Sequence, residues 1–112
     1  MSKRIAIIGA GPAGLMAAEV LSQYDYEVHV YEQKPSAARK FLMAGKTGLN
    51  ISHAEPIEQF VQRYDRAEWL EPWVRQWDAN WIQHWMKDLG IESYIGSSGR
   101  VFPLEMKAAP LL

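Results

Sequence analysis

The spacing of apolar residues in the first third of the chain predicts a strand, a helix and a second strand. Residues 5–8 form a short, wholly apolar run, typical of a parallel strand covered on both faces. From residue 13 to about residue 23, apolar residues recur at helical spacing, and Pro12 occupies a first-turn position where proline costs no hydrogen bond. A turn at residues 24–26 leads to a second strand at residues 28–31. We predict one βαβ unit.

Apolar residues recur at helical spacing again after Pro56, which predicts an amphipathic helix over residues 57–64. Its start is marked either by a capping box from Ser52 to Glu55 or by Pro56 itself. His53 lies beside this start, and we expect it to be a surface residue that makes hydrogen bonds rather than a catalyst.

Five tryptophans then follow one another at intervals of four residues: Trp69, Trp73, Trp77, Trp81 and Trp85. Pro72 and the expected N-cap Asp78 divide this stretch into two short helices, the second of which ends at Gly90. We expect the tryptophans to pack in a core, and a binding surface is the alternative. Residues 91–95 and 100–102 are predicted to be strands of a hairpin around a turn at 96–99.

The composition narrows the class of protein. The 112 residues are 48% hydrophobic and 22% charged, as in an ordinary globular domain, and the net charge of −1 gives no basic surface for nucleic acid. No stretch reaches the ~18 apolar residues of a membrane span. With no cysteine, disulfides and thiolate catalysis are excluded, and a reducing compartment, the cytoplasm, is expected. No spacing of histidines and carboxylates suggests a metal site.

The turn between the first strand and the helix carries the pattern G-x-G-x-x-G, with glycines at positions 9, 11 and 14. In a dinucleotide-binding turn the first glycine permits the tight turn, the second lets the backbone approach a pyrophosphate, and the third allows close packing of helix and strand. The helix N-terminus then presents free N–H groups to the diphosphate. The predicted contacts in this turn are Gly9, Gly11, Pro12, Ala13 and Gly14.

An acidic residue, Glu32, lies eighteen positions past Gly14 at the end of the second predicted strand. A carboxylate at this place accepts hydrogen bonds from the ribose of an adenine nucleotide and disfavours a 2′-phosphate. We therefore expect FAD or NAD rather than NADP to bind here, and Gln33 is a further predicted cofactor-binding residue.

The stretch Gly45-Lys46-Thr47 ends like a P-loop. That motif requires G-x-x-x-x-G-K-[ST] directly after a buried strand, whereas the position five residues before Gly45 is Lys40 and no strand pattern precedes it. We therefore reject a triphosphate site at these residues.

Three stretches, "GAGPAG", "ARKFLMAGKTGLNISHAEP" and "GSSGRVFPLEMKAAPLL", resemble the N-terminal portion of the BaiN/RdsA-like (YhiN-like) NAD(P)/FAD-dependent oxidoreductases. The resemblance covers essentially the whole chain and implies a partial Rossmann-like FAD/NAD(P)-binding fold. It places Arg39 and Lys40 near the pyrophosphate. Near the flavin it places Lys46, Thr47, Gly48, Leu49 and Asn50. Many relatives have "GGGRCN" where this chain has "GKTGLN", which puts any role of that cysteine in doubt.

From these patterns we expect an α/β chain, a partial Rossmann-like βαβ fold followed by helices and a β-hairpin. Residues 1–112 are expected to form the N-terminal part of the FAD-binding domain of a longer flavoprotein oxidoreductase, with residues 91–102 as the start of an inserted substrate domain. FAD is the expected cofactor, with NAD(P)H as reductant of the full enzyme, and no catalytic residue is assigned. Alone, the 112 residues are expected to bind FAD weakly or not at all and to be inactive. The alternatives are an NAD(H)-binding module and a truncated, non-catalytic chain that associates with itself through its tryptophans.

Overall fold

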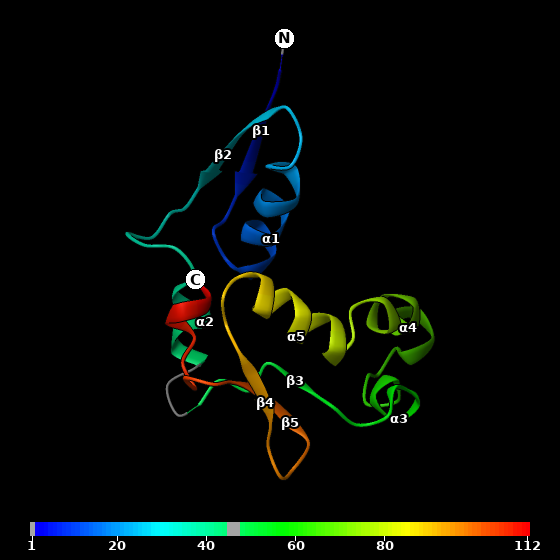
Figure 1. The fold of residues 1–112 in the computed structure, drawn as a ribbon. Coiled ribbons are helices and arrows are strands. Elements are labelled where there is room, and N and C mark those ends of the chain that lie inside the picture. Colours follow the sequence, from blue (N-terminus) through cyan, green and yellow to red (C-terminus); the bar gives the residue numbers. More distant parts are fainter. Residues whose placement is uncertain (1, 45–47) are drawn as a thin grey trace. The chain divides into compact units, whose positions relative to one another are not determined.

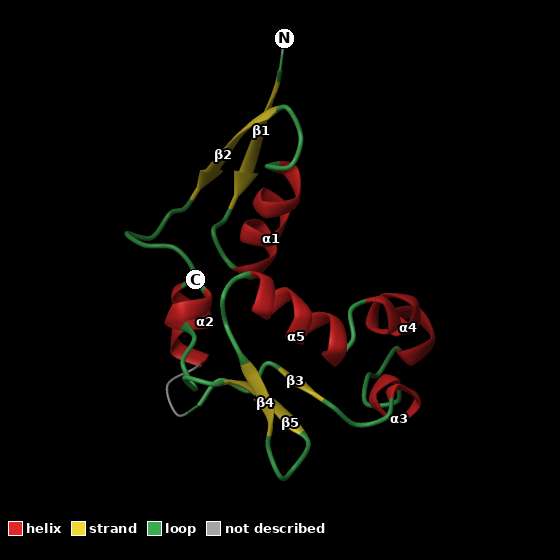
Figure 2. Ribbon diagram, viewed as in Figure 1, coloured by secondary structure: helices red, strands yellow, loops and turns green. Residues whose placement is uncertain are grey.

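The computed structural model describes residues 2–44 and 48–112. The chain divides into two compact units, Met1–Met43 and Ala44–Leu112, and each is described by itself. Figures 1 and 2 show their helices and strands. No helix in the described residues has the length and apolar character that crossing a membrane requires.

The first unit is a βαβ arrangement. Strand β1 (Lys3–Ile8) pairs in parallel with strand β2 (Tyr26–Tyr31), and helix α1 (Pro12–Leu21) connects them (Figure 1). The register runs from Lys3 opposite Tyr26 to Ile8 opposite Tyr31. A short helix, α2 (Arg39–Ala44), which the sequence pattern did not predict, begins in this unit. The predicted α/β class and the βαβ unit are confirmed.

Among the described residues, strand β1 is covered less than its apolar run predicts. Ile5 and Ile7 are half-buried, whereas Ile8 is 83% exposed and Tyr31, its partner on β2, is 56% exposed. Successive side chains of a strand point to opposite faces, and helix α1 covers one face only. The prediction of a strand covered on both faces is therefore wrong at Ile8.

In the part of the second unit that the structure describes, a three-stranded antiparallel sheet is accompanied by the helices α3, α4 and α5 (Figure 2). In the sheet, β5 lies between β3 and β4, and β4 and β5 form the predicted hairpin. Helix α5 contacts β3 and β4, and α3 contacts α4. The elements are β3 (Ser52–His53), α3 (Ile57–Val61), α4 (Ala67–Gln76), α5 (Ala79–Asp88), β4 (Ser93–Ile95), β5 (Arg100–Pro103) and the 3₁₀ helix η1 (Ala109–Leu111).

Of the two predicted starts of helix α3, the capping box is wrong and the start at Pro56 is confirmed. Ser52 belongs to strand β3, where it lies opposite Val101, so it cannot cap a helix. The helix instead begins after Pro56, which makes no side-chain cap hydrogen bond, and it ends at Val61. By contrast, Asp78 is the N-cap of α5 as predicted, because its Oδ1 accepts a hydrogen bond of 2.9 Å from the Trp81 N–H.

The tryptophans do not share one environment. Trp69, Trp73 and Trp77 are 72%, 55% and 42% exposed, so core packing is the wrong prediction for these three. Helix α4 contacts α3, and its residues Leu70 and Val74 are half-buried. Trp81 and Trp85 on α5 are half-buried, and their rings stack with centroids 6.1 Å apart.

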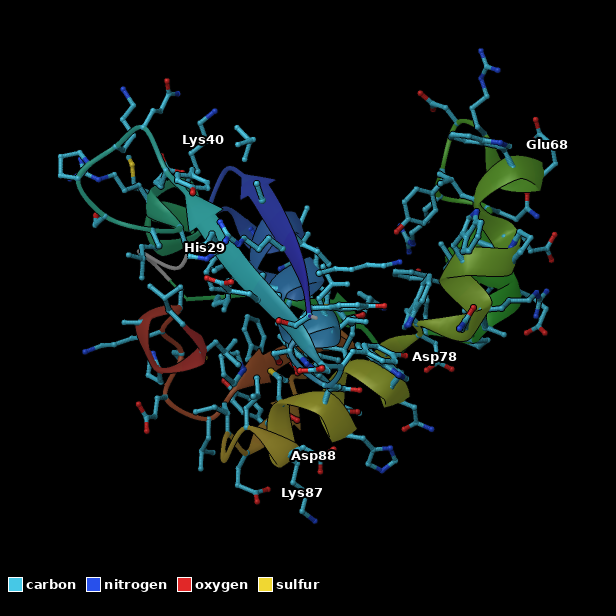
Figure 3. All side chains as sticks on the ribbon, turned by 90° about the horizontal axis from the view of Figure 1, so that it is seen from above. His29, Lys40, Glu68, Asp78, Lys87 and Asp88 are labelled. Atoms are coloured by element: carbon cyan, nitrogen blue, oxygen red, sulfur yellow. The ribbon has the colours of Figure 1, made fainter. Side chains whose placement is uncertain are left out.

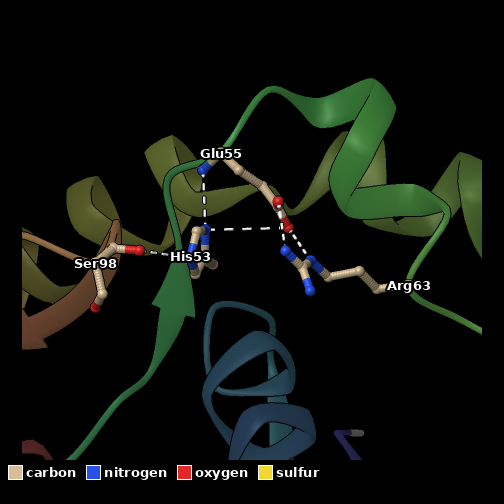
Figure 4. A network of polar contacts seen from close by, with 4 residues as sticks. All are labelled: His53, Glu55, Arg63 and Ser98. Carbon is tan, nitrogen blue, oxygen red and sulfur yellow. Dashed lines mark hydrogen bonds and ion pairs between the residues drawn. The ribbon is translucent and has the colours of Figure 1, made fainter.

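A polar network joins β3, the turn before β5 and the segment around α3 (Figure 4). The Nε2 of His53 lies 3.0 Å from the carbonyl oxygen of Ser98, and its Nδ1 accepts a hydrogen bond of 3.1 Å from the Glu55 N–H. The Glu55 carboxylate is held by the Arg63 guanidinium through two hydrogen bonds, which lower the pKa of Glu55. The expected hydrogen-bonding role of His53 is confirmed, although its side chain is only 27% exposed.

Replacing Gly99 by alanine is expected to lower the free energy of unfolding by about 1–3 kcal/mol. Gly99 has φ +84°, and a Cβ there would lie 2.7 Å from Cε1 of His53, a ring fixed through both nitrogens. Gly90→Ala is the matched control, because Gly90 has φ +85° but open space around the new Cβ. Urea denaturation measures the free energy of unfolding of both variants, and the difference between them reports the contact with His53. Equal losses of stability would contradict a steric contact between the new Cβ and His53.

Candidate functional site: the glycine turn of the first unit

The predicted dinucleotide turn is formed by the backbone that follows β1. The Gly9 N–H donates a 2.7 Å hydrogen bond to the Tyr31 carbonyl, which extends the parallel ladder one residue beyond the strands. Gly9 then turns with φ +103°, a conformation that side chains other than glycine disfavour. As the pattern predicts, the first glycine of the motif is needed because the turn requires a positive φ.

The third glycine is required because helix and strand approach closely. A Cβ on Gly14 would lie 2.1 Å from the Gly9 carbonyl oxygen and 3.3 Å from the side chain of Ile7. The first atom belongs to the turn after β1 and the second to β1 itself, so α1 can lie this close to β1 only if position 14 has no side chain. The third glycine therefore fixes the direction in which the helix N-terminus points.

The second glycine of the motif, Gly11, faces open space among the described residues. Gly11 is the N-cap of α1 and makes no side-chain cap hydrogen bond, and Pro12 occupies the first helical turn. A Cβ at Gly11 would meet no atom within 4 Å. The first N–H groups of a helix have no partner inside the helix, so this N-terminus offers donors and a partial positive charge to an anion. An open backbone surface of this kind fits a diphosphate.

The Glu32 carboxylate lies against the same turn. Its Oε1 accepts a hydrogen bond of 3.1 Å from the Ala10 N–H, and its Oε2 accepts one of 2.8 Å from the Lys34 N–H. These two bonds, the Lys34 bond foremost, lower the pKa of Glu32, so the group is an anion at neutral pH. Each carboxylate oxygen keeps a further lone pair that can accept a hydroxyl proton.

The loop after β2 closes back on the glycine turn. The Ala38 N–H donates a 2.8 Å hydrogen bond to the Ala10 carbonyl, and both residues are buried. Ala38 has φ +54°, an uncommon value for a residue other than glycine, asparagine or aspartate. The residue pattern does not identify Ala10, Lys34 and Ala38, because each contributes a backbone group and the residue type carries no signal for it.

The basic residues after this loop are on the surface. The Arg39 Nε donates a 2.9 Å hydrogen bond to the Ser36 Oγ, and Lys40 at the start of α2 is exposed (Figure 3). Gln33 is exposed as well. The contacts of these three residues with a dinucleotide stay a prediction.

The second predicted binding segment belongs to the second unit. Lys46 and Thr47 lie outside the described residues. Gly48 has φ +132°, Leu49 is 5% exposed, and Asn50 is exposed. Their predicted proximity to a flavin stays a prediction. Among the described residues, no three side chains of the metal-binding types come together.

A parallel βαβ unit, an open glycine turn and a carboxylate beside it define a Rossmann-type dinucleotide-binding module. The chain belongs to the HI0933-like protein Rossmann domain family, whose model matches residues 3–112.

Short segments are also similar to curated proteins. A 38-residue segment is 53% identical to the 6-hydroxynicotinate 3-monooxygenase of Pseudomonas fluorescens and covers 34% of this chain and 10% of that protein. A 32-residue segment is 53% identical to the NAD-dependent dihydropyrimidine dehydrogenase subunit PreT of Salmonella typhimurium and covers 29% of this chain and 8% of that protein. The matched segments thus span a tenth or less of the length of these relatives.

Proposed function

We propose that this chain is the part of an FAD-dependent oxidoreductase that binds the ADP moiety of FAD. The observation that carries the proposal is the position of the Glu32 carboxylate, hydrogen-bonded to the Ala10 N–H inside the open glycine turn. A diphosphate at the N-terminus of α1 and a ribose at Glu32 are the two recognition elements of an adenine dinucleotide.

The same carboxylate selects among dinucleotides. Glu32 already accepts two backbone hydrogen bonds and is ionised, so it can accept ribose hydroxyl protons but repels the 2′-phosphate of NADP. FAD and NAD therefore both fit this end of the site, and NADP is disfavoured.

FAD is preferred over NAD because of the resemblance to the BaiN/RdsA-like oxidoreductases and the similarity of one segment to a monooxygenase. In this proposal Arg39 and Lys40 contribute positive charge near the pyrophosphate, Gln33 contacts the cofactor, and residues 46–50 lie near the flavin. FAD supplies the redox chemistry when bound, with NAD(P)H as the reductant of the complete enzyme, and this chain binds and orients the cofactor. The cysteine-free composition agrees with a cytoplasmic enzyme.

Titration of the chain with FAD, NADH and NADPH tests the proposal. Micromolar binding corresponds to about −8 kcal/mol, and an anion at a helix N-terminus supplies only ~0.3–2 kcal/mol, so we expect weak binding of FAD. Flavin fluorescence quenching should show the tightest binding for FAD, and the intrinsic NADPH fluorescence should show the weakest for NADPH. Tighter binding of NADH than of FAD would favour the second candidate, an NAD(H) module, which the similarity to the NAD-dependent PreT subunit supports.

The exposed indoles Trp69, Trp73 and Trp77 favour a third candidate, a chain that associates with itself without a cofactor. Sedimentation of the cofactor-free protein distinguishes this candidate from the first. A monomer that binds FAD saturably supports the flavoprotein, and a concentration-dependent oligomer without FAD binding supports the alternative.

A further inference from the structure

A histidine links three segments of the second unit. His53 ends strand β3, and its Nε2 lies 3.0 Å from the Ser98 carbonyl oxygen in the turn between β4 and β5. Its Nδ1 accepts a 3.1 Å hydrogen bond from the Glu55 N–H, in the segment that leads into α3 (Figure 4). The same segment is tied to the turn by a 2.8 Å hydrogen bond from the Ala54 N–H to the Gly99 carbonyl. His53 therefore lies where the sheet, the hairpin turn and the start of α3 meet.

The two hydrogen bonds of His53 fix the charge and the tautomer of its ring. An amide N–H only donates, so Nδ1 must present its lone pair to Glu55 and carries no proton. A carbonyl oxygen only accepts, so Nε2 carries the proton and donates it to Ser98. The surroundings thus fit the neutral imidazole, and a second proton on Nδ1 would set two donors against each other.

The ring has little room to turn away from such a conflict. It lies against the backbone of Gly99, where an added Cβ would be 2.7 Å from Cε1 and 3.1 Å from Nε2 of His53. The His53 side chain is only 27% exposed. Relief must therefore come from the other partner, the segment at residues 54–56.

This segment also supplies an alternative partner for a protonated Nδ1. The Glu55 Oε1 is 4.0 Å from Nδ1, and the Glu55 side chain is 9% exposed. The carboxylate is bonded to the Arg63 guanidinium, with 2.8 Å between Oε2 and Nη2. These bonds hold the pKa of Glu55 below its ordinary value of 4.5, so the group stays an anion at about pH 5.5. A charged ring and Arg63 would then compete for one carboxylate.

One further charged residue faces the ring from the sheet. Arg100 lies directly opposite His53 in the register of β3 and β5, and side chains at opposite positions share a face. Helix α5 also contacts β3, and in the described part of the chain its ionisable residues form no hydrogen bond or ion pair with His53: Asp78, at its N-cap, His84, Lys87 and Asp88. A positive charge on His53 thus meets the anion of Glu55, which is already bonded to Arg63.

We propose that His53 is a pH-sensitive latch on helix α3. The neutral ring holds the Glu55 N–H before the helix and leaves the Glu55 carboxylate to Arg63, which lies just after the helix. Protonation of Nδ1 releases the N–H and draws the carboxylate from Arg63 toward the ring, so that α3 loosens at both ends. The latch does not depend on dinucleotide binding and goes beyond the proposed function.

Amide hydrogen exchange of the unaltered chain, followed by NMR, tests the latch between about pH 7.5 and about pH 5.5, where histidine changes its charge. Relative to the intrinsic rate at each pH, the Glu55 amide should exchange about three- to tenfold faster at the lower pH, the effect of about one lost hydrogen bond. The Phe60 amide, which bonds the Pro56 carbonyl in the first turn of α3, should lose protection with it. The Ile51 amide, which bonds the Val101 carbonyl of β5, should not change.

His53→Asn is the variant that removes the titrating group. Its side-chain oxygen can take the place of Nδ1 as an acceptor but gains no proton in this range, so the protection of the Glu55 amide should become independent of pH. His84→Asn is the matched control, because His84 is an exposed histidine on α5. This variant should keep the pH dependence of the unaltered chain.

Equal protection of the Glu55 amide at both pH values overturns the latch, as does a pH dependence that survives in His53→Asn. Faster exchange at Glu55 with unchanged exchange at Phe60 overturns the release of α3. An equal change at Ile51 would report opening of the whole sheet and also overturns the latch. The Glu55, Phe60 and Ile51 measurements use the unaltered chain, so the test stands if His53→Asn does not fold.

Discussion

Replacing Gly14 with alanine is expected to destabilise the first unit by about 3 kcal/mol or more, at the upper end of the effect of overpacking. The new Cβ would lie 2.1 Å from the Gly9 carbonyl oxygen and 3.2 Å from the Gly9 carbonyl carbon. Both are backbone atoms in a turn that is itself tied to Tyr31, so no side chain can rotate away to relieve the contact. Helix α1 would have to move off β1, and dinucleotide binding should be lost with it. Chemical denaturation followed by circular dichroism measures the change.

Gly11→Ala is the control for this substitution. The space around a Cβ at position 11 is open, so the free energy of unfolding should change by less than about 1 kcal/mol. The new methyl group stands at the N-terminus of α1, where the diphosphate is proposed to bind, so FAD affinity should still fall. If Gly11→Ala loses FAD binding while the fold stays intact, the role of Gly11 in binding is distinguished from the role of Gly14 in packing. A Gly14→Ala variant as stable as the unaltered chain would contradict the close packing of α1 on β1.

Replacing Glu32 with glutamine is expected to weaken FAD binding about 10- to 100-fold, the effect of one charge-assisted hydrogen bond. Both carboxylate oxygens accept from backbone N–H groups, of Ala10 and Lys34. A glutamine side chain has one acceptor oxygen, so its NH₂ group must face one of these donors. Fluorescence titration with FAD measures the loss. Glu27→Gln is the matched control, since Glu27 lies on β2, the strand that leads to Glu32, and pairs with Arg4 and His29 instead. Equal losses for both variants would contradict the assigned role of Glu32.

The pH dependence of stability gives a second measurement on Glu32. Its pKa in the folded chain lies below the ordinary value of 4.5, so the stabilisation from the ionised group is present above pH 4.5. It is lost as the pH falls below 4.5 and through the folded pKa. The difference in unfolding free energy between the unaltered chain and Glu32→Gln should therefore shrink in this range. A difference that stays constant down to pH 2 would contradict the lowered pKa.

The local patterns at the N-terminus predicted the structure well. A βαβ unit is predicted by the apolar run, the G-x-G-x-x-G spacing and the acid at the end of the second strand. Each of these signals acts between residues that are close in the sequence. Asp78 and the hairpin around residues 96–99 were predicted for the same reason. Helix α2 and strand β3 were missed, since six and two residues are too few to show a period.

The sequence by itself determined which residues form the glycine turn and which acid accompanies it, since backbone conformation and side-chain charge are local properties. Only the tertiary structure decided which partners they meet. It brought Glu32 to the Ala10 N–H, Met106 to Leu49 and His53 to Ser98. It also left the tryptophans at positions 69, 73 and 77, on α4 and at its C-terminal end, exposed. These outcomes depend on backbone groups and on the side of a helix that a neighbour covers. The residue types along the chain predict neither the partner of a backbone group nor the covered side of a helix.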